Sequence, residues 1–299
     1  MRLFRRSEDE GLERPKPHVL GYGTIGRLLR TPLASFGFFV LVVFVVCAIF
    51  APWVAPHDPL IQYSGHYLEG PSKTFLLGTD QIGRDALSRI IYGLRISLVV
   101  GVASVGLGTA VGSIIGLVSA YARGWVDATL MRMIDAIATF PSLIIAFGIV
   151  AALGAALVNL IIAIGIANIP YVARLVRSQA LSVRERDFVM AAEAVGTGHV
   201  RMIWRHIWPN CTAPVIVHAT MGMAYAVMAE ASLSFLGVGI PPPAASLGRE
   251  LRFAYKFLDT VPLLSIAPGV AIFLLVLALN FVGDALRDVL DPRLRGLIK

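Results

Sequence analysis

Residues 136–173 read AIATFPSLIIAFGIVAALGAALVNLIIAIGIANIPYVA and contain no charged side chain. A single helix of this length would measure about 57 Å at 1.5 Å per residue, whereas the hydrocarbon core of a bilayer is roughly 30 Å thick. We therefore expect this stretch to cross a membrane twice. Gly154–Asn159 lies near its middle and is the predicted turn between the two crossings.

Four further stretches are apolar and nearly free of charge, as a membrane core requires, because a charged side chain at its centre costs about 2.5–3.5 kcal/mol. They are residues 31–56, the stretch between Arg95 and Arg123, the stretch from His206 to about Phe235, and the stretch between Asp259 and Asp284. Together they predict an all-α, polytopic membrane protein with six transmembrane helices. A cleavable signal peptide is the alternative for residues 31–56, but the apolar run is longer than usual and no A-x-A site follows it directly.

The 26 lysines and arginines are distributed unevenly between the connecting segments. Nineteen of them lie in residues 1–30, in the segment holding Arg123 and Arg132, in residues 174–205, and in residues 287–299. Because segments rich in lysine and arginine stay in the cytoplasm, both termini are predicted to be cytoplasmic. This topology also accounts for the net charge of +7. Membrane lipid is therefore an expected partner and nucleic acid is not.

The predicted organisation follows from these spans. It comprises a cytoplasmic arm at 1–30, a first transmembrane helix at 31–56, an outer loop at 57–95, a five-helix core at 96–283 and a cytoplasmic tail at 284–299. The core includes a cytoplasmic segment at about 174–210 and an outer loop at about 237–262. In the first outer loop, Asp80 or Asp85 is expected to cap a helix or to pair with Arg84.

Small residues recur at every fourth position from Ser104 to Ala120. Gly108, Gly112 and Gly116 belong to this series and share one helix face, where a neighbouring backbone can approach closely. The sequence therefore predicts tight helix packing at these glycines.

Two acidic residues lie close to the predicted membrane core. Asp135 follows Arg132 by three positions, so an i, i+3 ion pair is expected to offset the cost of its burial. Glu230 has no evident partner in its own helix and is expected either to face a path across the membrane or to reach the outer water.

The cytoplasmic segment 174–210 contains a predicted short helix that ends at Gly196. Small and apolar residues are expected on one of its faces: Phe188, Val189, Ala191, Ala192 and Val195. The residues alone leave two interpretations open. The helix docks in a groove of a partner protein, or it lies on the surface of the bilayer.

Motifs typical of enzymes are missing from the sequence. It contains no G-x-x-x-x-G-K-[ST] phosphate loop, no H-E-x-x-H metal helix and no G-x-S-x-G nucleophile turn. We therefore predict that the chain is not an enzyme, with no catalytic residue, no metal site and no cofactor of its own.

Several groups of residues, in order along the chain, resemble motifs of one family of membrane proteins. They are Leu77–Asp85 with Ser88–Arg89 and Tyr92–Gly93; Arg132, Asp135 and Phe140–Ser142; Ala191–Ala192, Gly196 and His206–Asn210; Ala231–Gly237; and Gly283–Asp284, Leu286–Asp288 and Leu290–Pro292. Over about residues 25–296 the chain resembles the membrane permease of bacterial ABC importers of the dipeptide, oligopeptide and nickel group, specifically the second of their two paired permeases. Two positions depart from the family pattern: Met190 stands in place of a glutamate, and Leu247 in place of a tryptophan before Gly248.

The resemblance implies the type I permease fold of ABC importers, in a bacterial inner membrane. It makes segment 174–210 a coupling segment seated in a separate ATPase, through Arg184, Arg186, Phe188, Ala191, Ala192, Glu193 and Gly196. The implied partners are a homologous second permease, two ATPase subunits that bind ATP and magnesium, and an external solute-binding protein. Glu230, Phe235 and Asp135 are the candidates for the translocation path or its gate.

The implied cargo is a peptide, such as a dipeptide, an oligopeptide or glutathione. Import of nickel or another small solute on the same scaffold is the first alternative. An ion-coupled secondary transporter is the alternative from another class. Such a transporter is expected to show inverted repeats and charges at mid-membrane, and the sequence shows neither.

Overall fold

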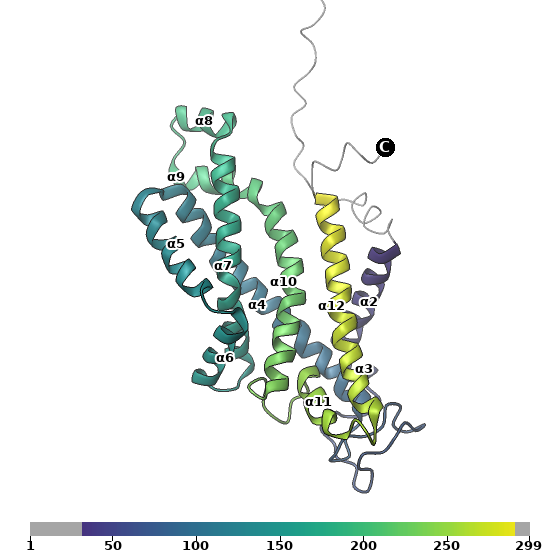
Figure 1. Ribbon diagram of the computed structural model, residues 1–299. Helices are drawn as coiled ribbons and strands as arrows, with labels where there is room; N and C mark the ends of the chain where they lie inside the picture. Colours follow the sequence, from purple (N-terminus) through teal and green to yellow (C-terminus); the bar gives the residue numbers. More distant parts are fainter. Residues whose placement is uncertain (1–31, 291–299) are drawn as a thin grey trace, which may run out of the picture.

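The computed structural model describes residues 32–290, and all regular structure in this part of the chain is helical (Figure 1). The helices are α2 (Pro32–Ile49), α3 (Ala51–Val54), α4 (Ala86–Ala122), α5 (Gly124–Ala138), α6 (Ser142–Leu153), α7 (Leu157–Arg184), α8 (Asp187–Ala194), α9 (His199–Arg201), η1 (Met202–Ile207, one π-helical turn), α10 (Trp208–Leu236), α11 (Leu247–Ala254), η2 (Tyr255–Phe257, a 3₁₀ turn) and α12 (Pro262–Leu290). The predicted all-α fold is confirmed. The predicted arm at 1–30 and the last residues of the predicted tail, 291–299, lie outside the described residues.

Five helical segments in the described part are long and apolar enough to cross a membrane. The pair α5–α6 supplies a sixth span, which is bent by 84°. The bend lies at Thr139–Pro141, where Pro141 has no backbone N–H to continue the hydrogen-bond ladder. Counted as one span, this bent pair brings the described residues to the six predicted spans, the third of them a broken helix.

The predicted turn within the long apolar stretch is present between α6 and α7. Gly154 ends α6 with a φ of +91°, a conformation that glycine adopts readily. The side-chain amide of Asn159 donates hydrogen bonds to the carbonyl oxygens of Leu153 and Gly154 at 2.9 and 3.0 Å. These bonds satisfy carbonyls at the end of α6 that have no partner within the helix.

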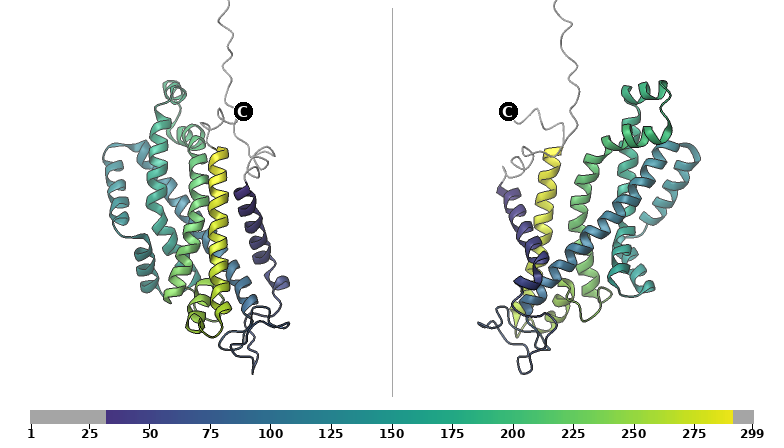
Figure 2. Two further views of the ribbon diagram at one scale, coloured as in Figure 1. Left: turned by 45° about the vertical axis from the view of Figure 1, so that its right-hand side comes forward. Right: turned by 180° about the vertical axis from the view of Figure 1, so that it is seen from behind.

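The two ends of the bundle differ in what they carry. Helix α4 crosses the bundle on a diagonal, and α8 and α9 project at one end (Figure 2). The beginning of α2 and the end of α12 lie at this same end, while the loop before α4 and helix α11 lie at the other (Figure 1). At the α11 end Arg84, Arg89 and Arg249 are buried, whereas Lys73, Arg252 and Lys256 are exposed. The cytoplasmic location of the α8 end stays a prediction.

Helices α4 and α7 form the most extensive helix pair among the described residues. A methyl group at Gly108 would lie 2.8 Å from the carbonyl oxygen of Gly165, and one at Gly116 would lie 2.6 Å from that of Ala173. At Gly112 it would lie 2.7 Å from Cβ of Val172. Real Cβ atoms do not come this near to other atoms, so only glycine lets the two backbones meet.

We predict that Gly116→Ala destabilises the chain by about 1–3 kcal/mol, because the added methyl group forces α4 away from α7. Thermal unfolding of the detergent-solubilised protein measures this loss. Gly106→Ala in the same helix is the matched control, since nothing lies within 4 Å of the new Cβ there. Both changes gain helix propensity, by about 0.5–1 kcal/mol. Equal stabilities for the two variants would contradict the packing argument.

Candidate functional site

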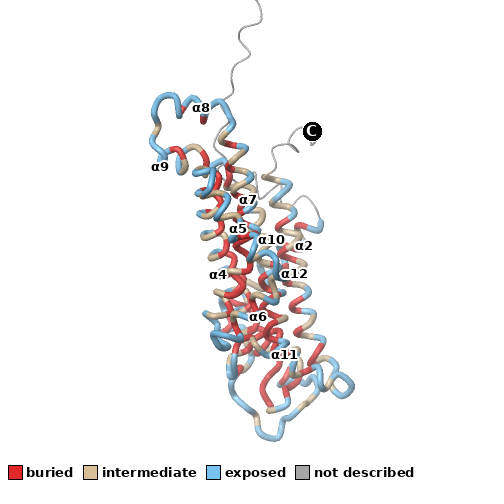
Figure 3. Tube along the Cα trace, turned by 60° about the vertical axis from the view of Figure 1, so that its left-hand side comes forward, coloured by how far each residue is buried: buried red, intermediate tan, exposed pale blue. Residues whose placement is uncertain are grey.

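Helix α8 stands out from the bundle, and most of its residues are exposed (Figure 3). Val189 and Ala192 are 1% and 9% exposed and pack onto a cluster that includes Met202 and Ile207. Phe188 and Val195, by contrast, are 42% and 82% exposed. The segment thus uses one side to attach to its own chain and leaves the other side uncovered.

The predicted alanine face of this helix is corrected by the structure. Ala191 is exposed, whereas Ala192 is buried against its own chain. Consecutive residues point about 100° apart around a helix. Ala192 can therefore face the rest of its own chain while Ala191 faces outward. The uncovered apolar stripe runs through Phe188, Ala191 and Val195, spaced three and four positions apart.

The polar residues assigned to the coupling segment have different environments. Arg186 and Glu193 are exposed. Arg184 instead turns back toward α4, where its Nη1 donates to the carbonyl oxygen of Tyr121 at 2.9 Å, so the structure gives it a partner in its own chain. Gly196 has a φ of +79°, and the next amide, of Thr197, donates to the carbonyl of Ala192 at 3.1 Å. This is the left-handed helix end that glycine favours.

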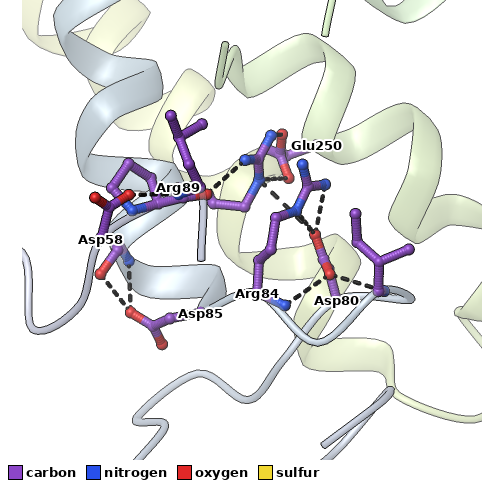
Figure 4. A network of polar contacts seen from close by, with 10 residues as sticks. Asp58, Asp80, Arg84, Asp85, Arg89 and Glu250 are labelled. Carbon is purple, nitrogen blue, oxygen red and sulfur yellow. Dashed lines mark hydrogen bonds and ion pairs between the residues drawn. The ribbon is translucent and has the colours of Figure 1, made fainter. Parts of the chain in front are cut away.

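A buried network of charged side chains joins three segments at the opposite end of the molecule (Figure 4). Arg89, in the first turn of α4, donates from Nε and Nη2 to the carboxylate of Glu250 in α11 at 2.9 and 2.6 Å. Its Nη1 donates to the carbonyl of Pro59 at 2.9 Å. Arg84 donates to Asp80 at 2.6 Å through both Nε and Nη2. The outer loop, α4 and α11 are therefore held together by paired charges.

Part of this network agrees with the sequence prediction and part was missed. Asp80 pairs with Arg84, and Asp85 accepts a hydrogen bond from the backbone N–H of Ser88 at 2.9 Å at the start of α4, so pairing and capping are both confirmed. The pair between Arg89 and Glu250 joins residues 161 positions apart, and no local pattern indicates it.

A third guanidinium lies beside these pairs. Arg249 is 6% exposed, donates from Nη1 to the carbonyl of Ile240 at 3.3 Å and stands 5.5 Å from the ring centre of Phe253. Burial lowers the pKa of the Arg249 side chain, and the nearby carboxylate of Glu250 opposes that effect.

Glu230 occupies neither of the two positions expected from the sequence. Its side chain is fully buried and accepts hydrogen bonds from Ser97 of α4, Ser246 before α11 and Ser234 of its own helix, at 2.7, 2.7 and 2.9 Å. The expectations that it reaches outer water and lacks a partner in α10 are therefore wrong. The carboxyl group acts as a shared acceptor that joins α4, α10 and the segment leading to α11.

The other two gate candidates lie at different ends of the molecule. Asp135 pairs with Arg174 of α7 at 2.7 Å, so the predicted partner, Arg132, is wrong. A helix neighbour was expected, but the adjacent helix α7 brings the cation closer. Phe235, near the end of α10, is 38% exposed and its ring centre lies 6.4 Å from that of Tyr255.

A groove of about 540 Å³ opens along α4, η1 and α10. Its lining is mainly apolar and includes Trp204 and Trp208, whose rings are packed edge to face. Thr109 and Ser113 also line it, and their hydroxyl groups have no hydrogen-bond partner among the described residues. The sequence did not predict this groove, because it depends on the diagonal course of α4. Within residues 32–290, no three His, Cys, Asp or Glu side chains are grouped as metal ligands.

Comparison with known families gives two matches along the chain. Residues 108–296 match the family described as binding-protein-dependent transport system inner membrane component. Residues 23–71 match the family described as the N-terminal TM domain of oligopeptide transport permease C.

Individual relatives cover nearly the whole chain. The dipeptide transport system permease protein DppC of Alkalihalophilus pseudofirmus is 40% identical over 270 residues, which are 90% of this chain and 89% of the relative. A putative peptide transport system permease protein of Brucella suis is 43% identical, over 91% and 92% of the two chains. The glutathione transport system permease protein GsiD of Escherichia coli is 38% identical, over 90% and 89%.

Solved structures share the fold at lower sequence identity. A chain of the MetNI methionine ABC transporter, in inward-facing conformations, superposes with a TM-score of 0.56 and 18% identity over 67% of this chain and 96% of its own. A chain of an amino acid ABC transporter with histidines superposes with a TM-score of 0.53.

We predict that Glu250→Leu destabilises the chain by about 3–5 kcal/mol, because it leaves the buried guanidinium of Arg89 without its carboxylate. The double variant Arg89→Met with Glu250→Leu is expected to be more stable than Glu250→Leu alone, since it removes both charges. Denaturation in detergent compares them, with the exposed Asp259→Leu as control. A double variant no more stable than the single one would argue against a buried, mutually dependent pair.

Proposed function

Because this chain belongs to the family of binding-protein-dependent transport system inner membrane components, we propose that it forms one half of the transmembrane pathway of an ATP-driven peptide importer. The chain is a multi-pass inner-membrane permease. The observation that carries the proposal is the uncovered apolar stripe on α8, at the end of the bundle away from the charged network. Such a stripe is covered either by a partner protein or by the bilayer surface, and membership of this family favours a partner protein.

The partner for α8 is a separate ATPase subunit. No phosphate-binding loop exists anywhere in this sequence, so ATP and magnesium must be bound by another polypeptide. Phe188, Ala191 and Val195 form an apolar ridge at helical spacing, the pattern by which a helix docks in a groove. Arg186 and Glu193 flank this ridge as exposed charges that orient the docking.

A second permease completes the pathway in this proposal, and two ATPase subunits serve the pair. The groove along α4 and α10 supports a position next to the path or to the second permease. It is mainly apolar and lies in the spanning part of the chain.

The mechanism follows from the placement of these parts. Closure of two ATPase subunits on ATP would displace α8, and the helices attached to it would move between inward-open and outward-open arrangements. An external solute-binding protein would deliver cargo to the end that carries the outer loop and α11. Selection of cargo would then rest mainly on that binding protein.

Peptides are the proposed cargo, because relatives at 38–43% identity are named as dipeptide, peptide and glutathione permeases. Nickel or another small solute, carried by the same scaffold, is the alternative that a transport assay must separate.

We predict that Phe188→Asp and Ala191→Arg each reduce co-purification of the ATPase about tenfold, the effect of losing an interface contact worth about 1–2 kcal/mol. Tagged chain is purified in mild detergent, and bound ATPase is quantified by its activity. Ala155→Arg, an exposed alanine in the turn between α6 and α7, is the matched control. Retention of the ATPase by both α8 variants would refute the docking assignment.

We predict that vesicles containing the permease pair, the ATPase and the binding protein take up a labelled dipeptide only when ATP is supplied. Unlabelled oligopeptide, glutathione and a nickel chelate serve as competitors that define the cargo. Competition by the nickel chelate alone would transfer the assignment to metal import. Uptake driven by an ion gradient without ATP would favour a secondary transporter instead.

A further inference from the structure

The chain segments before and after α8, here called its two limbs, both contact one residue of α4, Tyr121. Arg184 precedes α8, and its Nη1 donates to the carbonyl oxygens of Tyr121 at 2.9 Å and Ala120 at 3.4 Å. The guanidinium also lies over the Tyr121 ring, 5.2 Å from its centre. His199 follows α8, and its Nδ1 is hydrogen-bonded to the Tyr121 hydroxyl. Tyr121 thereby closes the base of the loop that carries α8.

These contacts satisfy groups that would otherwise lack partners. Tyr121 lies in the last turn of α4, which ends at Ala122. Carbonyl groups in the last turn of a helix find no N–H donor within that helix. The positive guanidinium of Arg184 complements the negative end of the helix dipole. The edge-to-face packing of the His199 and Tyr121 rings, 5.5 Å between centres, adds an apolar contact.

Helix α4 connects this clamp to the far end of the molecule. It runs through 37 residues without a proline, from Ala86 to Ala122. Its first turn holds Arg89, which is bound to Glu250 of α11. A displacement of the α8 segment that reaches Tyr121 is therefore applied to a continuous helix whose other end is fixed to the outer segments.

The two limbs do not depend on Tyr121 equally. Arg184 belongs to α7, which is already packed against α4 through Gly108, Gly112 and Gly116. His199 belongs to the short helix α9, which reaches the bundle only after α8. The contact between Tyr121 and His199 therefore gives the returning limb a direct hydrogen bond to α4.

We infer that Tyr121 is a positioning residue for energy coupling: through His199 and Arg184 it transmits the displacement of α8 to α4. The inference rests on the proposed function, since it supposes that an ATPase moves α8. Loss of the tether lets the ATPase displace α8 without moving α4 to the same extent. ATP is then hydrolysed with less transport, and the quantity that changes is the amount of peptide taken up per ATP hydrolysed.

The test uses the complete complex in vesicles and measures peptide uptake and ATP hydrolysis in the same sample. Tyr121→Phe keeps the ring and removes the hydroxyl, and His199→Ala removes its partner. Each is expected to lower uptake per ATP about fivefold. This factor corresponds to a free energy of about 1 kcal/mol, the typical contribution of one hydrogen bond. Because the two residues act through one contact, the double variant is expected to be no worse than either single variant.

Two further variants separate coupling from simple packing. His199→Gln keeps a hydrogen-bonding group and is expected to retain much of the wild-type peptide uptake per ATP hydrolysed. Tyr171→Phe removes a hydroxyl from a side chain on α7 that is 57% exposed, and is expected to change nothing.

An unchanged ratio in Tyr121→Phe, effects that multiply in the double variant, or uptake and hydrolysis falling in parallel would each overturn the inference. The wild-type complex tests the proposed function separately. No ATP-driven uptake in the wild type would refute the importer, whereas a working wild type with unaffected variants would refute only the role of Tyr121.

Discussion

Helices α4 and α7 approach each other so closely that no methyl group fits between them at Gly108, Gly112 or Gly116. In a bilayer the hydrophobic effect gives little drive for helices to associate, because lipid tails are as apolar as leucine. Dispersion contacts over a long, close interface supply that drive instead. The other elements are attached to this pair. Helices α5 and α6 connect α4 to α7, α8 follows the end of α7, and the start of α4 contacts the outer segments.

The outer end is stabilised by a different principle. Arg89, Glu250, Asp80 and Glu230 are all buried, and each has partners that satisfy it. Buried pairs of this kind give little net stability but penalise the loss of one member strongly. They therefore specify one arrangement of α4, α10 and α11 and resist small rearrangements. Glu230 illustrates the principle within the membrane region, where three serine hydroxyls replace the water that the carboxyl group has lost.

The sequence predicts the parts of this structure that depend on composition and local spacing. The absence of charge in residues 136–173 indicates the hairpin, because a charge there is costly. The spacing of Gly108, Gly112 and Gly116 indicates a packing face, and Asp85 indicates a helix cap. Contacts between distant segments were predicted poorly: Asp135 was given Arg132 as partner instead of Arg174, and the pairing of Arg89 with Glu250 was missed. Such pairs depend on which helices pack side by side, and a local sequence pattern does not indicate which helices these are.

The contrast between the two ends bears on how movement would pass through the chain. At the α8 end, apolar residues are uncovered and the loop is tied to α4 at Tyr121, through its backbone carbonyl and its hydroxyl, whereas the α11 end is fixed by several buried charges. A displacement of the α8 end reaches the rest of the bundle only if the element that connects them is stiff. A continuous α4 supplies that stiffness, because its backbone hydrogen bonds are made within the helix and are not exchanged when the helix tilts. Removal of the Tyr121 hydroxyl would leave α4 and its packing against α7 intact but remove the direct hydrogen bond between α4 and the limb that follows α8.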